Sequence, residues 1–399
     1  MPSPSARAVG LLAAALGLSS PAPAAAVEVF HAGASRLFVG GDFSVSMAEK
    51  DRGYFNDHDY GQNALRAVRT RLTAELRVGA HVAALGELRH ENEDHPRVYA
   101  LYVRLRPWRK GPLDIQAGQI PHVFGAYTRR TYAADNPLIG EPLAYQYLTA
   151  LRADAAPSRT RELLEMRGRG WQLSYPLGNT DPAAGLPAMN ARHWDTGLEM
   201  RLRFHHFDVA AAITQGSPSS PRFPHDDNDG KCLSARLSWW PVPGLIAGVS
   251  AARGRYVEDR VEELIGVPRV QRLAGADLEY SRGRWQFRAE TVLGSWDAPI
   301  ADPTRHDVDL EAWAAMLEMR VKVMSGLSVA ARGDRLTFGD VPAADGGLPW
   351  DYAVTRGEAG VVYVPLRHVQ LKASFQHNRR DGGRVRRQSF VAGQVLLWF

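Results

Sequence analysis

The sequence predicts an all-β fold, a transmembrane antiparallel β-barrel of about sixteen strands. Three observations lead to this prediction. About sixteen segments alternate apolar and polar residues, the connections between them are alternately short and long, and an export-like N-terminus precedes a chain without any long apolar stretch. In a transmembrane barrel one face of each strand contacts lipid and the other faces a polar lumen, so the average hydropathy stays low.

The N-terminus, residues 1–26, reads as a secretory signal peptide. Its apolar run, Val9–Leu18, is too short to span a bilayer as a helix. Ala24 and Ala26 fit the small-residue cleavage rule. We therefore expect export through the inner membrane and one barrel that takes up residues 27–399.

The strands are recognised by their two different faces. In one of them Leu198, Met200 and Leu202 alternate with Glu199 and Arg201. An arginine on the lipid side costs roughly 2–4 kcal/mol near the bilayer midplane, so the charged face must point inward. The predicted strands are 37–47, 68–76, 82–88, 99–105, 113–118, 194–204, 207–213, 233–239, 245–251, 274–280, 285–293, 313–323, 327–335, 353–363, 369–375 and 391–399.

The connections support an outer-membrane barrel over a soluble β-sandwich. Short connections such as Arg203–Phe207 and Ser281–Gly283 alternate with long polar ones such as Ser217–Lys231 and Arg255–Arg269. Short periplasmic turns and long outer loops are typical of outer-membrane barrels. Both ends of the mature chain then lie on one side, which requires an even number of strands, sixteen or eighteen.

The connection Phe124–His193 is far longer than a surface loop needs to be, and loops of this length are usually functional or disordered. Its many tyrosines and leucines indicate order. We expect part of it to fold into the barrel and narrow the lumen, which in a wide barrel stays water-filled unless something occludes it. An external cap, or an extra membrane hairpin around Gly170–Leu177, is the alternative.

The charged residues of this loop and of the predicted lumen face are the candidate constriction residues. Rings of arginine bias a pore toward anions, and the interspersed carboxylates reduce this to a mild preference. Arg–carboxylate pairs that only hold the loop in place are the alternative. The candidates are Arg129, Arg130, Asp135, Glu141, Arg152, Arg159 and Arg161 in the loop, and Arg69, Arg71, Arg104, Arg106, Glu199, Arg201, Arg203, Glu318 and Arg320 on the wall, whose same face also carries Glu290, Arg332, Arg356, Glu358 and Lys372.

A short motif allows a resemblance to be named. The segment Gly118–Gly125, GQIPHVFG, resembles the strand end that precedes the long third loop of phosphate-selective-porin-like and related Gram-negative porins. With the terminal Phe399 and the signal peptide, the whole chain resembles this superfamily of sixteen-stranded barrels. The chain departs from the phosphate-specific members because carboxylates are interspersed along its lumen face. The resemblance therefore implies a passive diffusion channel for small hydrophilic solutes, surrounded by outer-membrane lipid and lipopolysaccharide, and a homotrimer.

Other classes of function have weaker support. A substrate-specific channel, or an adhesion barrel whose outer loops bind a ligand, is the second hypothesis. A barrel-embedded hydrolase is the third, and the chain has neither a G-x-S-x-G element nor an HExxH motif. Cys232 is the only cysteine, which excludes an intrachain disulfide framework and a cysteine-rich metal site. We expect no catalytic residues, metal or cofactor. We also expect no nucleic-acid partner, because the net charge of +5 is small for a chain of this size and nucleic-acid binding needs a clustered basic face.

Overall fold

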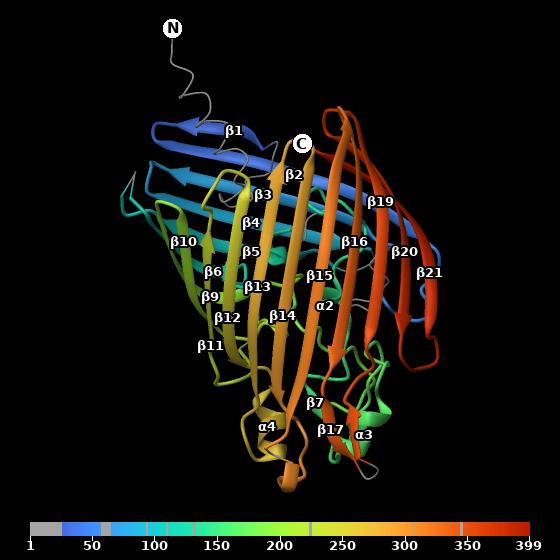
Figure 1. The fold of residues 1–399 in the computed structure, drawn as a ribbon. Helices are drawn as coiled ribbons and strands as arrows, with labels where there is room; N and C mark the ends of the chain where they lie inside the picture. Colours follow the sequence, from blue (N-terminus) through green and yellow to red (C-terminus); the bar gives the residue numbers. More distant parts are fainter. Residues whose placement is uncertain are drawn as a thin grey trace.

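The computed structural model describes residues 26–56, 65–92, 95–108, 111–130, 133–222, 226–305, 307–343 and 346–399. Within these residues, sixteen antiparallel strands close into a barrel (Figure 1), as the sequence predicts. Neighbours in the chain pair throughout, and the last strand returns to the first. The strands are β2 (Ser35–Ala48), β3 (Val68–Val78), β4 (Val82–Glu91), β5 (Arg97–Leu105), β6 (Leu113–Ile120), β9 (Asp195–Phe204), β10 (Phe207–Thr214), β11 (Cys232–Trp239), β12 (Leu245–Arg255), β13 (Val270–Arg282), β14 (Trp285–Asp297), β15 (Asp309–Met324), β16 (Leu327–Phe338), β19 (Val354–Leu366), β20 (Val369–Arg380) and β21 (Arg387–Trp398).

The barrel closes at β2, where two other strands pair with different parts of the same edge. β21 pairs with Asp42–Ala48, and Phe399 exchanges backbone hydrogen bonds with Gly41. A further strand that the sequence analysis did not predict, β1 (Val27–Ala32), pairs with the remaining part of β2. The predicted signal peptide lies outside the described residues except for Ala26.

The two faces of the wall differ as the alternation predicts. Leu198, Met200 and Leu202 of β9 are exposed on the outside, whereas Glu199 and Arg201 are buried on the inside. The same holds around the ring, where exposed leucine, valine, phenylalanine and tryptophan form an apolar outer belt. A one-residue register slip would place the charges on the outside, so this pattern fixes the register of each strand.

The connections divide the barrel into a short-turn end and a long-loop end. Two-residue turns such as His205–His206 and Arg367–His368 lie at the short-turn end, with both of these turns containing a residue of positive φ. The long-loop end carries small elements of its own (Figure 1), among them β7 (Ala155–Ala156), α3 (Thr160–Glu165), β8 (Leu177–Gly178), α4 (Asp259–Ile265), η2 (Pro303–Arg305), β17 (Asp340–Ala343) and β18 (Gly346–Pro349). Among the described residues, no helix is long and apolar enough to cross a membrane.

The first part of the connection between β6 and β9, which spans residues 121–194, lies inside the barrel. Its helices η1 (Tyr127–Arg129) and α2 (Leu143–Gln146) lie on the inside, and α2 contacts β15 and β16 (Figure 1). The largest cluster of buried apolar side chains includes Phe124, Tyr145 and Tyr147 of this connection. The expectation that the long loop folds inward is therefore confirmed.

Candidate channel constriction

The inner part of the long loop, residues 124–148, is tied to the barrel wall at several points. The wall side chains involved belong to β12, β13, β14, β16, β19 and β20, which form one side of the ring. Most of the bonds reach backbone groups of the loop, which have lost their hydrogen bonds to water and need partners inside the barrel. The loop is thus fixed against one side of the lumen.

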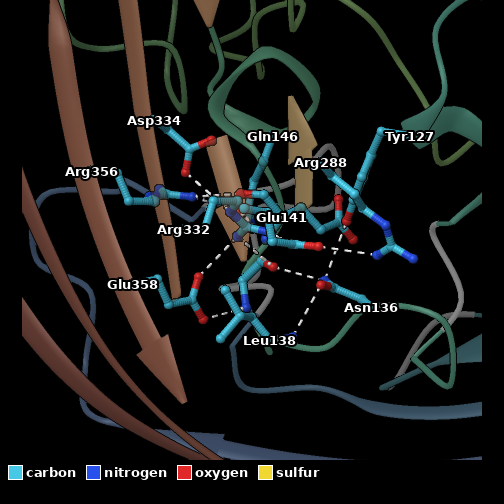
Figure 2. A network of polar contacts seen from close by, with 12 residues as sticks. Tyr127, Asn136, Leu138, Glu141, Gln146, Arg288, Arg332, Asp334, Arg356 and Glu358 are labelled. Atoms are coloured by element: carbon cyan, nitrogen blue, oxygen red, sulfur yellow. Dashed lines mark hydrogen bonds and ion pairs between the residues drawn. The ribbon is translucent and has the colours of Figure 1, made fainter. Parts of the chain in front are cut away.

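Arg332 on β16 is the centre of the largest group of contacts (Figure 2). Its guanidinium pairs with Asp334 at 3.2 Å, Glu318 at 3.4 Å and Glu358 at 2.9 Å, and donates to the Gly140 carbonyl at 2.8 Å. Glu358 accepts the Gly140 amide at 2.9 Å, so both backbone groups of this glycine are held. Arg332 is fully buried, and an arginine with this many oxygen partners is a fixed structural anchor.

Two more basic side chains hold the loop by its carbonyl groups. Arg356 on β19 donates to the Glu141 carbonyl at 2.8 Å and to the Gln146 side chain at 3.2 Å. Lys372 on β20 donates to the carbonyls of Asn136, at 2.6 Å, and Ala133. Three adjacent wall positions therefore use positive charge to fix residues 133–146.

The start of the loop is anchored on Glu290 of β14. Its Oε1 atom accepts the Ala126 amide at 3.1 Å and the Tyr145 hydroxyl at 2.6 Å. Gly125 has φ +62°, and a side chain there would collide with the Glu290 carboxylate. Gly118 has φ +128°, and a side chain would collide with the Leu101 carbonyl. The two glycines of the motif thus permit the bends that direct the chain from β6 into the lumen.

On the other side of the ring the predicted wall residues pair with one another. Arg69 pairs with Glu91 at 2.6 Å, Arg71 with Asp42, and Arg104 and Arg106 with Asp114 at 2.7 and 3.2 Å. On β9, Arg201 pairs with Glu199 at 2.6 Å and Arg203 pairs with Asp208 at 2.8 Å. Each pair is local to the wall, so this side presents nearly balanced charge to the lumen.

Three arginines come together, beside carboxylates, where the loop meets β13, β14 and β15. Arg130 pairs with Glu279, and Arg288 pairs with Glu318 at 3.0 Å. Arg320 is half-buried, and its hydrogen bond runs to the Ser328 hydroxyl at 3.4 Å. Arg288 lies close enough to both Arg130 and Arg320 to repel them electrostatically. Asp135 is exposed at the loop tip and interacts electrostatically with Arg71 and Arg130.

The remaining predicted loop residues lie elsewhere. Glu141 is buried and accepts a hydrogen bond from Arg192 at 3.1 Å. Arg152 is buried within the outer part of the loop, where it pairs with Asp154 at 2.8 Å and donates to the Leu173 carbonyl. Arg159 and Arg161 are exposed at the start of α3, at the long-loop end. The side chain of Arg129 is outside the described part of the chain.

His122 follows β6 and is predicted to stay uncharged in mildly acidic solution. Burial lowers its pKa from 6.5 to about 4, although a hydrogen bond with the His193 backbone opposes this shift. Because the folded pKa is depressed, the folded state loses stability as the pH falls from 6.5 toward 4, by about 3 kcal/mol in total.

Histidine-labelled protein in micelles tests this prediction by NMR, with His122→Gln used to assign the signal. The ring of His122 is expected to be neutral at pH 5. A midpoint for His122 near 6.5 would contradict the prediction.

Comparisons with known proteins agree with this architecture. No protein-family model matches the chain, and no curated protein matches its sequence. Among solved structures, OmpF of Salmonella typhi in complex with daunomycin matches with a TM-score of 0.59 at 11% identity, over 94% of this chain and 100% of that one. An anion-selective porin from Comamonas acidovorans matches at 0.55 and 11%, over 92% and 100%. The outer-membrane channel DcaP of Acinetobacter baumannii matches at 0.55 and 11%, over 94% and 100%.

These matches confirm the predicted fold class, a closed sixteen-stranded antiparallel barrel of the kind found in porins. They cover nearly the whole described chain and all of each matched chain. At 11% identity the likeness establishes the shared fold. The number of strands is sixteen rather than eighteen, because the predicted alternative of a membrane hairpin around Gly170–Leu177 is instead part of the folded loop.

Proposed function

We propose that the protein is an outer-membrane porin, a passive channel for small hydrophilic solutes. The observation that carries the proposal is the closed barrel with an apolar outer belt and a charged interior partly filled by an anchored loop. An apolar belt of this kind suits a bilayer, and a polar interior suits water and solutes. The likeness to known porins and channels supports the same reading.

Planar lipid bilayers test the proposal directly. Folded protein, added from detergent, is expected to produce discrete ohmic current steps, and liposomes that contain it are expected to admit small sugars. Folded protein that inserts without current or solute uptake would contradict the channel. Passage requires no catalytic step, and the proposal assigns no catalytic residue. A current that a particular solute blocks at low concentration would support the second hypothesis, a substrate-specific channel.

We further propose a mild anion preference without a phosphate-specific site. Three arginines, Arg130, Arg288 and Arg320, lie near one another where the loop meets the wall. Arg320 forms no ion pair within the described residues, whereas the opposite side of the ring is charge-balanced. A field of one sign at a narrow point favours counter-ions of the other sign.

Replacing Arg320 by glutamate is expected to shift the reversal potential in a potassium chloride gradient toward cation selectivity. The exchange changes the local charge by two units in the lumen without removing an ion pair. Arg367→Glu, an exposed site in a turn at the short-turn end, is the matched control and is expected to leave the reversal potential close to wild type. Equal shifts in both variants would show that selectivity does not depend on Arg320.

The oligomeric state is also a proposal. The resemblance to porins implies a homotrimer, and the apolar outer belt offers the surface for it. Chemical crosslinking of the protein in native outer membranes is expected to give a species of three times the monomer mass. Only monomers under conditions that crosslink a known trimeric porin would contradict this.

A further inference from the structure

A row of arginines crosses the outside of the barrel at the long-loop end. Strand register places Arg335 of β16 beside Thr355 of β19, Thr355 beside Arg379 of β20, and Arg379 beside Arg387 of β21. All four side chains are exposed on the outer face. Adjacent strands lie about 4.8 Å apart, so the three guanidinium groups can reach one ligand.

The described part of the chain does not neutralise this row. No ion pair or hydrogen bond joins the three arginine side chains to any described residue, and the following turn adds exposed Arg384 and Arg386 against one acid, Asp381. Arg272, also outward-facing near this end on β13, is different because Asp297 pairs with it at 2.6 Å. The outward Arg272 is therefore balanced by carboxylates, whereas Arg335, Arg379 and Arg387 on β16–β21 are not.

Beneath the row the outer face becomes apolar over two levels of residues. Gly333 and Gly357, paired with each other, form the next outward level, and nothing lies within 4 Å of the position of a side chain on either one. Ala331 and Ala359 form the level below, and the exposed Phe375 lies beside Ala359 on β20. His377 and Ser389, which share a hydrogen bond of 2.8 Å, complete the first level on β20 and β21. The surface is therefore apolar from the level of Ala331, Ala359 and Phe375 downward.

We propose that Arg335, Arg379 and Arg387 bind the phosphorylated headgroup of an outer-leaflet glycolipid, lipopolysaccharide, whose acyl chains lie over the small residues below. The proposal rests on the proposed outer-membrane location, with the long loops outside. An arginine on the lipid-facing side costs far less near the membrane interface than at the bilayer midplane, so the row is compatible with contact with lipid. The planar guanidinium group of arginine binds phosphate oxygens in a bidentate manner. A soluble anion would have no reason to prefer the lipid-facing side of the wall.

The test measures retention of bisphosphorylated lipid A by the folded full-length protein in detergent micelles, using native mass spectrometry. The wild type is expected to retain lipid A, and the triple variant R335Q/R379Q/R387Q to bind it roughly tenfold more weakly or worse, since several charge-assisted hydrogen bonds are lost. The control R282Q/R284Q/R367Q removes the same charge from exposed sites at the short-turn end and is expected to bind like the wild type.

Two further binding measurements distinguish the phosphates of lipid A from free inorganic phosphate as the ligand. Lipid A without phosphate is expected to bind the wild type as weakly as bisphosphorylated lipid A binds the triple variant, and millimolar inorganic phosphate is expected not to displace lipid A. Equal binding by wild type and triple variant, equal loss in the control, or displacement by inorganic phosphate would each overturn the proposal. Retention is read without any current, so a barrel that fails to conduct would contradict the channel and leave this result standing.

Discussion

Replacing residues 129–141 by a short glycine–serine linker is expected to raise single-channel conductance several-fold. This segment contains Arg130 and Asp135, and it is bound to Glu279, Glu358 and Lys372 on one side of the lumen. A sixteen-stranded barrel is wide enough to hold an aqueous channel when nothing fills it, so removing the segment enlarges the narrowest cross-section. Ion selectivity is expected to weaken at the same time, because Arg130 is lost from the positive cluster.

The structure makes a narrow deletion feasible. Ala126 and Tyr145 both bond to the same oxygen of Glu290, so the two ends of the deleted segment remain close and anchored. The sequence alone would suggest a wider deletion, Tyr127–Leu164, to open the lumen. It would also remove the Ala150 amide that Asp351 binds at 3.0 Å at the long-loop end. Replacing the exposed η2 turn by the same linker is the control and is expected to leave the current unchanged. An unchanged current after the 129–141 replacement would exclude a constriction formed by this segment.

The strands could be predicted because the physics that fixes them is local. A charged residue on the outer face of β9 or β15 would face lipid, so Glu199, Arg201 and Glu318 had to point inward whatever the rest of the chain does. The short turns follow from the same alternation. β1 escaped prediction because its side chains are exposed on both faces, and its place on the edge of β2 depends on where β21 ends.

Part of the charge pairing was also accessible from the sequence. Residues i and i+2 of a strand lie on the same face, so Glu199–Arg201, Glu87–Arg89 and Arg332–Asp334 are pairs that a period-two reading allows. This i, i+2 spacing is the sequence signal that favours ion pairs within the wall over a pore-lining role for these arginines.

The loop anchors were not accessible in this way. Gly140 contacts Arg332 and Glu358, which are 192 and 218 positions away in the sequence, and nothing in the loop's own pattern selects that point of contact. For the same reason Arg152, Arg159 and Arg161 could not be distinguished from Arg130, although they lie in the outer part of the loop. Their positions follow from packing against α4, β17 and the Asp351 loop, which is tertiary information.

Replacing Arg332 by methionine is expected to destabilise the folded barrel by about 3–5 kcal/mol, as is typical when one partner of a buried ionic group is removed. Asp334 and Glu358 would be left buried without their shortest cationic contact, and the Gly140 carbonyl would lose its donor. Methionine nearly fills the same volume but supplies no positive charge. Urea unfolding in micelles measures the loss, with Arg253→Met, an exposed site on β12, as the control.

A second substitution separates lost charge from lost packing. If uncompensated carboxylates cause the destabilisation, adding Glu358→Gln to Arg332→Met must recover part of it, because one buried charge is removed while the cavity is unchanged. If packing causes it, the double variant must be at least as unstable as the single one. Arg332→Met that unfolds like Arg253→Met would contradict the anchoring role altogether. Because the anchor acts on Gly140, the single variant is also expected to show more open-channel current noise than the wild type. Of the wall side chains, Glu358, Arg356 and Lys372 then still hold residues 136–141.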